Sequence, residues 1–221
     1  IIRFKANDII LISLIMKVKL TKNQLKESYD KLVIRTQFDL DFILLTIVAA
    51  AICSFGFRMN SSSVIIGAMV LSPILLTVVA IGASISRYRW KNVVKNFTTL
   101  FLSIIIGIAT SFIINNFFPV TSGSEITERI LANQADYFAV AFFSGLAGTF
   151  AYFWPGIIEA IAGIAISVAL IPPVVMVGIG LARWDMPLLT SSLEIVLINV
   201  SGITVGSFLL VMALNVRSVK E

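Results

Sequence analysis

Long apolar runs separated by short polar clusters fill the chain from about residue 40 onwards. A helix needs about 20 predominantly apolar residues to cross a hydrocarbon core of about 30 Å. The pattern therefore predicts an all-α membrane protein with about six transmembrane helices. We expect them at about residues 41–57, 63–86, 96–118, 136–153, 157–182 and 188–214. The fourth is rich in glycine, and a re-entrant segment is the alternative there.

Two of the predicted spans carry prolines near their middle. Residues 163–184 contain the pair Pro172 and Pro173, and residues 67–90 contain Pro73. A proline inside a helix removes a backbone hydrogen bond and clashes with the preceding turn, at a cost of about 3 kcal/mol or more. In lipid, only protein or a wet cavity can satisfy the freed backbone groups. We therefore expect two helix breaks inside the protein, one at Pro73 and one at the proline pair.

The order of features repeats between the two halves of the predicted membrane domain. Each half reads as a helix, a proline-broken helix and a second helix. Because three spans are an odd number, the second half starts on the opposite side of the membrane from the first. This inverted repeat is typical of many secondary transporters. The best local match pairs residues 71–73 (LSP) with residues 170–172 (LIP), and chance similarity between apolar helices is the alternative.

Residues 21–37 predict an amphipathic helix ahead of the first span. Leu25, Tyr29, Leu32 and Val33 fall on one face, and charged residues occupy the others. We expect this helix to lie on the membrane surface. A helix that docks in the groove of a partner protein is the alternative.

Composition supports the membrane assignment and removes several enzyme classes. Hydrophobic residues make up 58% of the 221 residues and charged residues 13%, against about 45–50% and about 25% in soluble domains. There is no histidine, and Cys53 is the single cysteine. The common zinc sites and the Ser-His and Cys-His nucleophile pairs are therefore excluded. No phosphate-binding or dinucleotide-binding motif occurs. We expect neither an enzyme nor a bound metal or cofactor.

The basic residues are placed asymmetrically along the chain. Of the 17, eight precede residue 38, four lie at positions 87–95, and Arg217 and Lys220 lie in the tail. The positive-inside rule then predicts cytoplasmic N- and C-termini in an inner or plasma membrane. We expect an interfacial segment at 1–37, a membrane domain at 38–216 and a tail at 217–221. This placement explains the net charge of +5 without a nucleic-acid partner.

Several motifs resemble those of one protein family. They are residues 60–69 (NSSSVIIGAM) followed by Ser72 and Pro73, residues 139–148 (AVAFFSGLAG), residues 163–180 with the proline pair, and Asn199. In order and spacing they resemble the hydrophobic membrane proteins of the domain-of-unknown-function 389 family, over roughly residues 38–214. The resemblance implies a multi-pass membrane protein and adds no chemistry.

The helix breaks are the predicted binding site. A break leaves bare N–H groups on one half-helix and bare carbonyls on the other, which attract anions and cations respectively. A simple kink satisfied by a neighbouring helix is the alternative. The candidate binding residues are Ser72, Pro73, Thr77, Pro172, Pro173, Glu194 and Asn199.

Glu194 and Asn199 are candidates because polar groups inside a membrane are costly. Glu194 lies about a turn inside the sixth predicted span, where it could bind a proton or cation. Its alternative is to extend towards the outer interface and Arg183. Asn199 lies near the centre of that span, where a hydrogen bond to another helix is favoured over a ligand.

Two functions follow from these patterns. The first is a transporter or channel that moves a small solute or ion through a site at the helix breaks. The second is a non-transporting anchor, sensor or assembly module that works through its N-terminal region. Wet breaks would favour the first, and dry, packed breaks the second. Membrane lipids are expected partners, and small residues four apart, such as Gly202 and Gly206, allow packing within the chain or a homo-oligomer.

Overall fold

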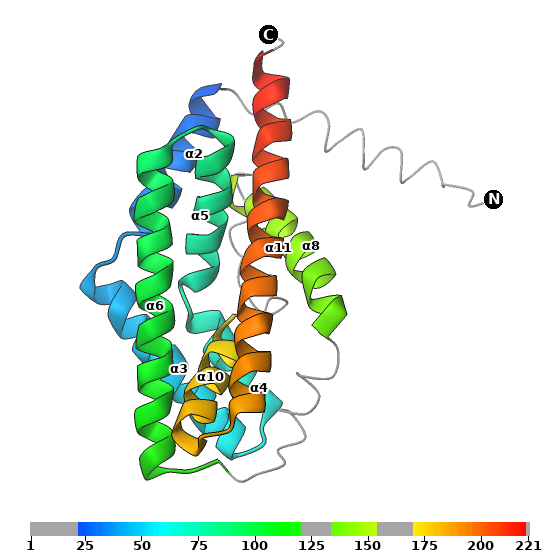
Figure 1. Cartoon of the computed structure of the whole chain (residues 1–221). Coiled ribbons are helices and arrows are strands. Elements are labelled where there is room, and N and C mark those ends of the chain that lie inside the picture. The colour runs from blue at the N-terminus through cyan, green and yellow to red at the C-terminus, as the bar shows by residue number, and fades with distance from the viewer. Residues whose placement is uncertain (1–21, 121–133, 154–169, 220–221) are drawn as a thin grey trace, which may run out of the picture.

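The computed structural model describes residues 22–120, 134–153 and 170–219. Every regular element in these ranges is a helix (Figure 1). The helices are α2 (Lys22–Arg35), α3 (Leu40–Arg58), α4 (Ser62–Leu71), α5 (Ile74–Ser86), α6 (Trp90–Phe117), α8 (Gln134–Phe153), α10 (Ile171–Arg183) and α11 (Met186–Val219).

Three of the described helices are long and apolar enough to cross a membrane, namely α3, α6 and residues Met186–Leu214 of α11. A fourth candidate is the pair α4 and α5, which meet at a bend of 49°. The fourth predicted span coincides with α8, which is not among these candidates. The fifth is described only from Leu170, where it forms the short apolar α10. The described residues thus contain three to four candidate spans, which is compatible with a membrane protein.

Local chemistry explains several helix ends. The Asp39 carboxylate accepts a hydrogen bond from the Phe42 amide at 2.9 Å, so α3 starts at a capped N-terminus. In the same way the Asp185 carboxylate accepts from the Leu188 amide at 3.1 Å and caps α11. Between α10 and α11, Trp184 takes a left-handed conformation (φ 54°), and the Asp185 amide donates to the Gly180 carbonyl at 2.9 Å. These bonds close the turn that reverses the chain.

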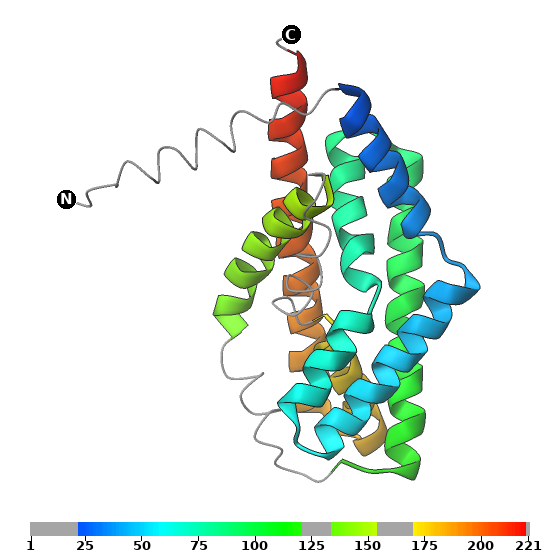
Figure 2. The same ribbon diagram turned by 180° about the vertical axis from the view of Figure 1, so that it is seen from behind.

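Two half-length helices lie between two long ones. Both α5 and α10 pack against α6 on one side and α11 on the other. Figures 1 and 2 show α5 rising from the middle of the molecule to the end that holds α2, whereas α10 runs from the middle to the opposite end. Helix α3 packs on α4 and α6, and α8 crosses α11. The starts of α5 and α10 therefore come together halfway along the molecule.

Glycines allow the closest helix approaches. A methyl group added at Gly202 would lie 2.7 Å from the Ala141 Cβ, and one at Gly206 would strike the Phe142 carbonyl, both on α8. One added at Gly178 would lie 2.6 Å from the Ile108 carbonyl oxygen of α6. Gly202 and Gly206, four residues apart, thus pack within the chain.

The amphipathic helix predicted at 21–37 is present as α2. Its apolar residues Leu25, Tyr29 and Leu32 are buried against the protein, because α2 packs on α5 and α8. The face expected to rest on lipid therefore rests on other helices. The physical reason is that α5 offers polar partners as well as apolar contact. The Tyr29 hydroxyl lies 3.0 Å from the Ser84 Oγ.

Candidate functional site

The first break separates α4 from α5. Proline restricts the residue before it to extended backbone, and Ser72 is extended (φ −75°, ψ 126°). Helix α4 therefore stops at Leu71. The Ser72 amide donates to the Met69 carbonyl at 3.4 Å, and the Ile74 amide donates to the Ser72 Oγ at 3.3 Å. Ser72 is thus the C-cap of α4, and its hydroxyl accepts a hydrogen bond from the first amide of α5.

Thr77 lies one turn further along α5 and is fully buried. Its hydroxyl donates to the Pro73 carbonyl at 3.5 Å. A hydroxyl bonded to the carbonyl four residues earlier is a usual partner for threonine inside a helix. The hydroxyls of Ser72 and Thr77 therefore both bond to the backbone at the break.

The proline pair stands in the first turn of α10 rather than in its middle. Leu170 is the N-cap residue, and Pro172 and Pro173 follow directly after Ile171. Amides in a first turn have no partner within the helix, so a proline there removes no hydrogen bond. The cost expected for a proline in a helix interior does not arise within α10. Residues 157–169 of the predicted fifth span lie outside the described residues.

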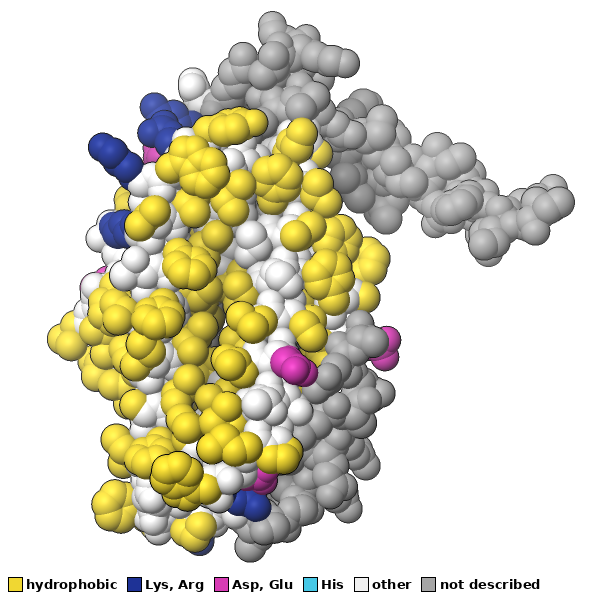
Figure 3. All heavy atoms as spheres, in the orientation of Figure 1, with side chains coloured by type: hydrophobic (Ala, Val, Ile, Leu, Met, Phe, Trp, Pro, Cys, Tyr) yellow, Lys and Arg dark blue, Asp and Glu magenta, His cyan; other side chains and the backbone are white. Residues whose placement is uncertain are grey.

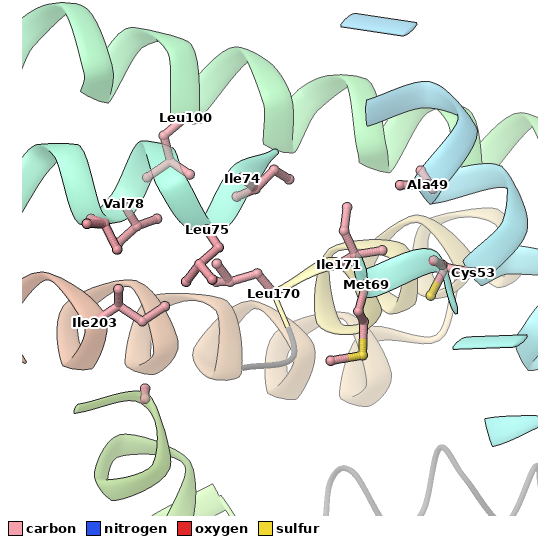
Figure 4. Packing of buried hydrophobic residues seen from close by; sticks show 14 of the residues in the cluster. Ala49, Cys53, Met69, Ile74, Leu75, Val78, Leu100, Leu170, Ile171 and Ile203 are labelled. Atoms are coloured by element: carbon pink, nitrogen blue, oxygen red, sulfur yellow. The ribbon is translucent and has the colours of Figure 1, made fainter. Parts of the chain in front are cut away.

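The first break and the start of α10 meet in the folded chain. Figure 4 shows Leu75 beside Leu170, and Ile171 beside Met69, within one hydrophobic cluster. We call these four residues the break cluster. Each is buried, with 1% to 7% of its surface exposed. Segments about 100 residues apart in the sequence are thus brought together by the packing of α10 on α4.

The break cluster is apolar. Its four side chains carry no hydrogen-bonding group except the weakly accepting Met69 sulfur, and the hydroxyls beside it bond to backbone. Within the described residues, this conformation presents packed hydrocarbon at the meeting of the breaks. A junction packed with apolar side chains counts against an open pathway in this conformation.

Asn199 and Glu194 differ in their placement. Asn199 is 2% exposed and lies one turn before Ile203, on the same face of α11. Ile203 belongs to the hydrophobic cluster and lies near Leu75 in Figure 4. Glu194 is exposed on α11. The fold thus keeps Ser72, Pro73 and Thr77 at the first break and Pro172 and Pro173 at the start of α10, and the two places are linked by the neighbours Met69, Leu75, Leu170 and Ile171. Asn199 is buried on α11, and Glu194 is exposed there.

The sequence did not reveal which hydroxyl groups form hydrogen bonds between helices. The Ser111 Oγ donates to the Val175 carbonyl at 2.8 Å and joins α6 to α10. The Ser207 Oγ donates to the Val79 carbonyl at 2.8 Å and accepts from the Thr149 hydroxyl at 2.9 Å, which joins α5, α8 and α11. No sequence signal separates these residues from Thr46 or Ser54, which bond within their own helix.

A second polar cluster fixes α2 to the turn between α5 and α6. The Arg87 guanidinium lies 5.0 Å from the centre of the Tyr29 ring and donates to the Leu25 carbonyl at 3.2 Å. The Asn92 amide donates to the Tyr29 hydroxyl at 2.8 Å. Partial burial lowers the pKa of Arg87, and Tyr29 and Asp30 oppose that shift. The cluster joins the N-terminal helix to the end of α5.

Comparison with known proteins identifies relatives of the chain. The model of the family described as "Domain of unknown function (DUF389)" matches residues 69–205, which include both breaks, Glu194 and Asn199. A curated protein of Methanocaldococcus jannaschii, named "Uncharacterized protein MJ0678", is 27% identical over 180 residues, covering 80% of this chain and 54% of the relative. The chain thus spans about half the length of that relative. No solved structure matches.

Proposed function

The chain belongs to this DUF389 family, and from that premise we propose that it moves a small solute or ion across a membrane through the junction of its two helix breaks. The observation that carries the proposal is the meeting of the breaks. Half-helices that begin or end at the midplane are typical of the binding sites of secondary transporters. Here α4 ends, and α5 and α10 begin, around one cluster of side chains.

The proposal includes six spans arranged as an inverted repeat. Helices α3, α4 with α5, and α6 form the first half, and α8, the segment that ends in α10, and α11 form the second. The order of the described helices supports this pairing. The concentration of basic residues before residue 38, at 87–95 and in the tail supports cytoplasmic termini in an inner or plasma membrane.

The apolar break cluster corresponds to a closed state in this proposal. Hydrophobic constrictions gate channels by excluding water. Met69 and Leu75 close the junction from the side of α4 and α5, and Leu170 and Ile171 close it from the start of α10. Solute passage then requires α10 to move away from α4 and α5. A substrate screen would begin with small anions, because the positive dipole ends of α5 and α10 both lie at the junction.

Cysteine accessibility tests the proposal directly. On a Cys53→Ser background, Ser72→Cys and Ile171→Cys would be treated from each side of the membrane with a small impermeant thiol reagent. Transport predicts that both positions react, from opposite sides under different conditions. Ser63→Cys, at an exposed position of α4, provides the positive control, and Ser54→Cys, at a buried position of α3, the negative one. Absence of labelling at both break positions, with working controls, would contradict transport.

The alternative function is a non-transporting anchor, sensor or assembly module. The specific observation in its favour is that α2 is fixed to the bundle by Tyr29 and Arg87. An N-terminal region that docks firmly on the end of α5 can transmit a change at that end to the first break. Truncation of residues 1–37 separates the two functions. If the chain is a sensor, the truncation should abolish its response to a signal while the membrane domain stays stable. If the chain is a transporter, the truncated protein should keep its labelling pattern at Ser72→Cys and Ile171→Cys.

A further inference from the structure

The start of α6 carries an exposed stripe of large apolar side chains. Trp90, Val94, Phe97 and Phe101 are 61%, 66%, 58% and 57% exposed. At about 100° per residue these four positions fall within an arc of about 60°. They extend over about 16 Å along the helix, which is about half of a 30 Å hydrocarbon core. The stripe has the length of an acyl chain in one leaflet.

Exposed cations border the upper end of this stripe. Lys91 and Lys95 lie one turn apart on the adjacent face of α6, and Arg89 precedes the helix. Residues 86–95 hold four basic residues and no acidic one. Within the part of the chain that the structure describes, none of these three cations forms an ion pair with another described residue, whereas Lys31 pairs with Glu27 at 2.7 Å. Figure 3 shows basic side chains gathered at this end of the molecule, next to a largely apolar face.

The turn that presents these cations is held in one conformation. The Arg89 amide donates to the Ser84 carbonyl at 3.0 Å, and the Tyr88 amide donates to the Ile85 carbonyl at 3.0 Å. Arg87 anchors the turn to α2 through the Leu25 carbonyl. Tyr88 adopts a left-handed conformation (φ 54°), and its side chain is 81% exposed. The turn therefore projects Tyr88 and Arg89 outward, and Lys91 and Lys95 follow on the exposed first turns of α6.

We propose that this surface binds an anionic glycerophospholipid, with the phosphate held by Arg89, Lys91 and Lys95 and an acyl chain lying along Trp90, Val94, Phe97 and Phe101. Unpaired cations attract a negative headgroup, and tryptophan and tyrosine favour the headgroup region of a bilayer. The adjoining apolar stripe requires a ligand with a hydrocarbon chain, which a free anion lacks. The site is independent of the helix breaks and of any transport.

Native mass spectrometry of the purified full chain in neutral detergent tests the site. Dioleoylphosphatidylglycerol and dioleoylphosphatidylcholine would be added separately, and retained lipid would be counted. The test variant is Arg89→Gln/Lys91→Gln/Lys95→Gln. The matched control is Lys26→Gln/Lys31→Gln/Arg35→Gln, which removes the same charge from exposed positions on the neighbouring α2. A basic residue near an anionic surface contributes about fivefold in affinity, so the test variant should bind phosphatidylglycerol about 100-fold more weakly.

Each outcome decides the proposal. A large loss in the test variant, with little loss in the control and weak binding of phosphatidylcholine, supports the site. Equal losses in both variants would show general charge attraction and overturn it, as would equal binding of the two lipids by the unmodified chain. Full competition by inorganic phosphate or by glycerol phosphate would show that the site binds a soluble anion rather than a lipid, and would also overturn the proposal. Since all three substituted side chains are exposed, misfolding is not expected, and a single Lys95→Gln variant with about fivefold loss provides a second measurement.

Discussion

Uncharged hydroxyl groups join helices inside an interior that is mostly apolar. Ser207 is the clearest case, because it is fully buried and bonds to two other helices at once. Its partners are the Val79 carbonyl on α5 and the Thr149 hydroxyl on α8. Measured hydrogen bonds between membrane helices contribute about 0.6 kcal/mol on average and up to about 1.7 kcal/mol. A single serine can therefore account for a measurable part of the stability.

We expect Ser207→Ala to lower the free energy of unfolding by about 1–2 kcal/mol, because it removes both bonds and leaves the Thr149 hydroxyl with only the Gly145 carbonyl as partner. Chemical denaturation of the purified protein in detergent would measure the change. Ser201→Ala is the matched control on the same helix, since Ser201 is exposed and bonds to the Ile198 carbonyl of its own turn. Equal effects of the two substitutions would contradict the role given to Ser207.

The prolines show at the residue scale how position decides effect. Pro73 and the proline pair were expected to interrupt helices at a cost of about 3 kcal/mol. Pro73 instead separates α4 from α5, whose first amide bonds to the Ser72 hydroxyl, and the pair lies in the first turn of α10. The presence of proline correctly predicted that regular helix is interrupted at Pro73. Whether the interruption costs free energy depended on the hydrogen bonds around it.

At the element scale, glycines set how closely the helices pack. Gly178 lets α10 approach the backbone of α6, and Gly202 and Gly206 do the same for α11 and α8. The Ser111 hydroxyl crosses the first of these contacts to reach the Val175 carbonyl. Close backbone approach and hydroxyl bonds occur together, as expected where van der Waals packing drives helix association in lipid.

Gly178→Ala should destabilise the protein by about 1–3 kcal/mol, because the added methyl group meets the Ile108 carbonyl of α6 at 2.6 Å. Gly67→Ala is the matched control, since nothing lies within 4 Å of a methyl group at that position in α4. Alanine is the better helix former, so the control should be neutral or stabilising by up to about 1 kcal/mol. The two variants would be compared by thermal unfolding in detergent. A neutral Gly178→Ala would show that α6 and α10 are not tightly packed.

At the scale of the whole molecule, α2 closes one end of the bundle. It connects the N-terminal region to α5 and α8 and to the turn before α6. The face of the molecule that Figure 3 shows is apolar over most of its length. α6 exposes Phe97, Phe101 and Ile105, among others, a surface that suits lipid and would be unfavourable in water. The molecule thus combines an exposed apolar side with a cluster of polar contacts that attaches α2 at one end.

We predict that Tyr29→Phe weakens the attachment of α2 to α5 and α6, because it removes the contacts of the hydroxyl with Ser84 and Asn92 while keeping the buried ring. Faster amide hydrogen exchange is expected in residues 22–35, with α10 and α11 unchanged. Tyr88→Phe is the matched control, since the Tyr88 side chain is 81% exposed and should not affect α2. Unchanged exchange in α2 of the Tyr29 variant would mean that apolar burial alone holds the helix.

Local pattern was enough to predict where several of the helices lie. The first span was expected at 41–57, and α3 covers Leu40–Arg58; the sixth was expected at 188–214, within α11. Apolar run length is a local property that can be read directly, whereas the Asp39 cap was found in the structure. The likeness to the family rested on similar local motifs and is confirmed over residues 69–205. The inverted repeat is a longer-range property and stays a prediction.

Tertiary structure decided which of these local features come together. It placed Leu170 and Ile171 against Met69 and Leu75, directed the apolar face of α2 onto protein, and left Glu194 exposed on α11. The sequence alone determined that the chain forms apolar helices, that helix is interrupted at Pro73, and that no histidine chemistry is available. The interruption of a span at the proline pair stays a prediction. It could not determine the contacts between interruptions about 100 residues apart, because these depend on side-chain shape and backbone approach across helices. The local hydrophobic pattern does not record either property.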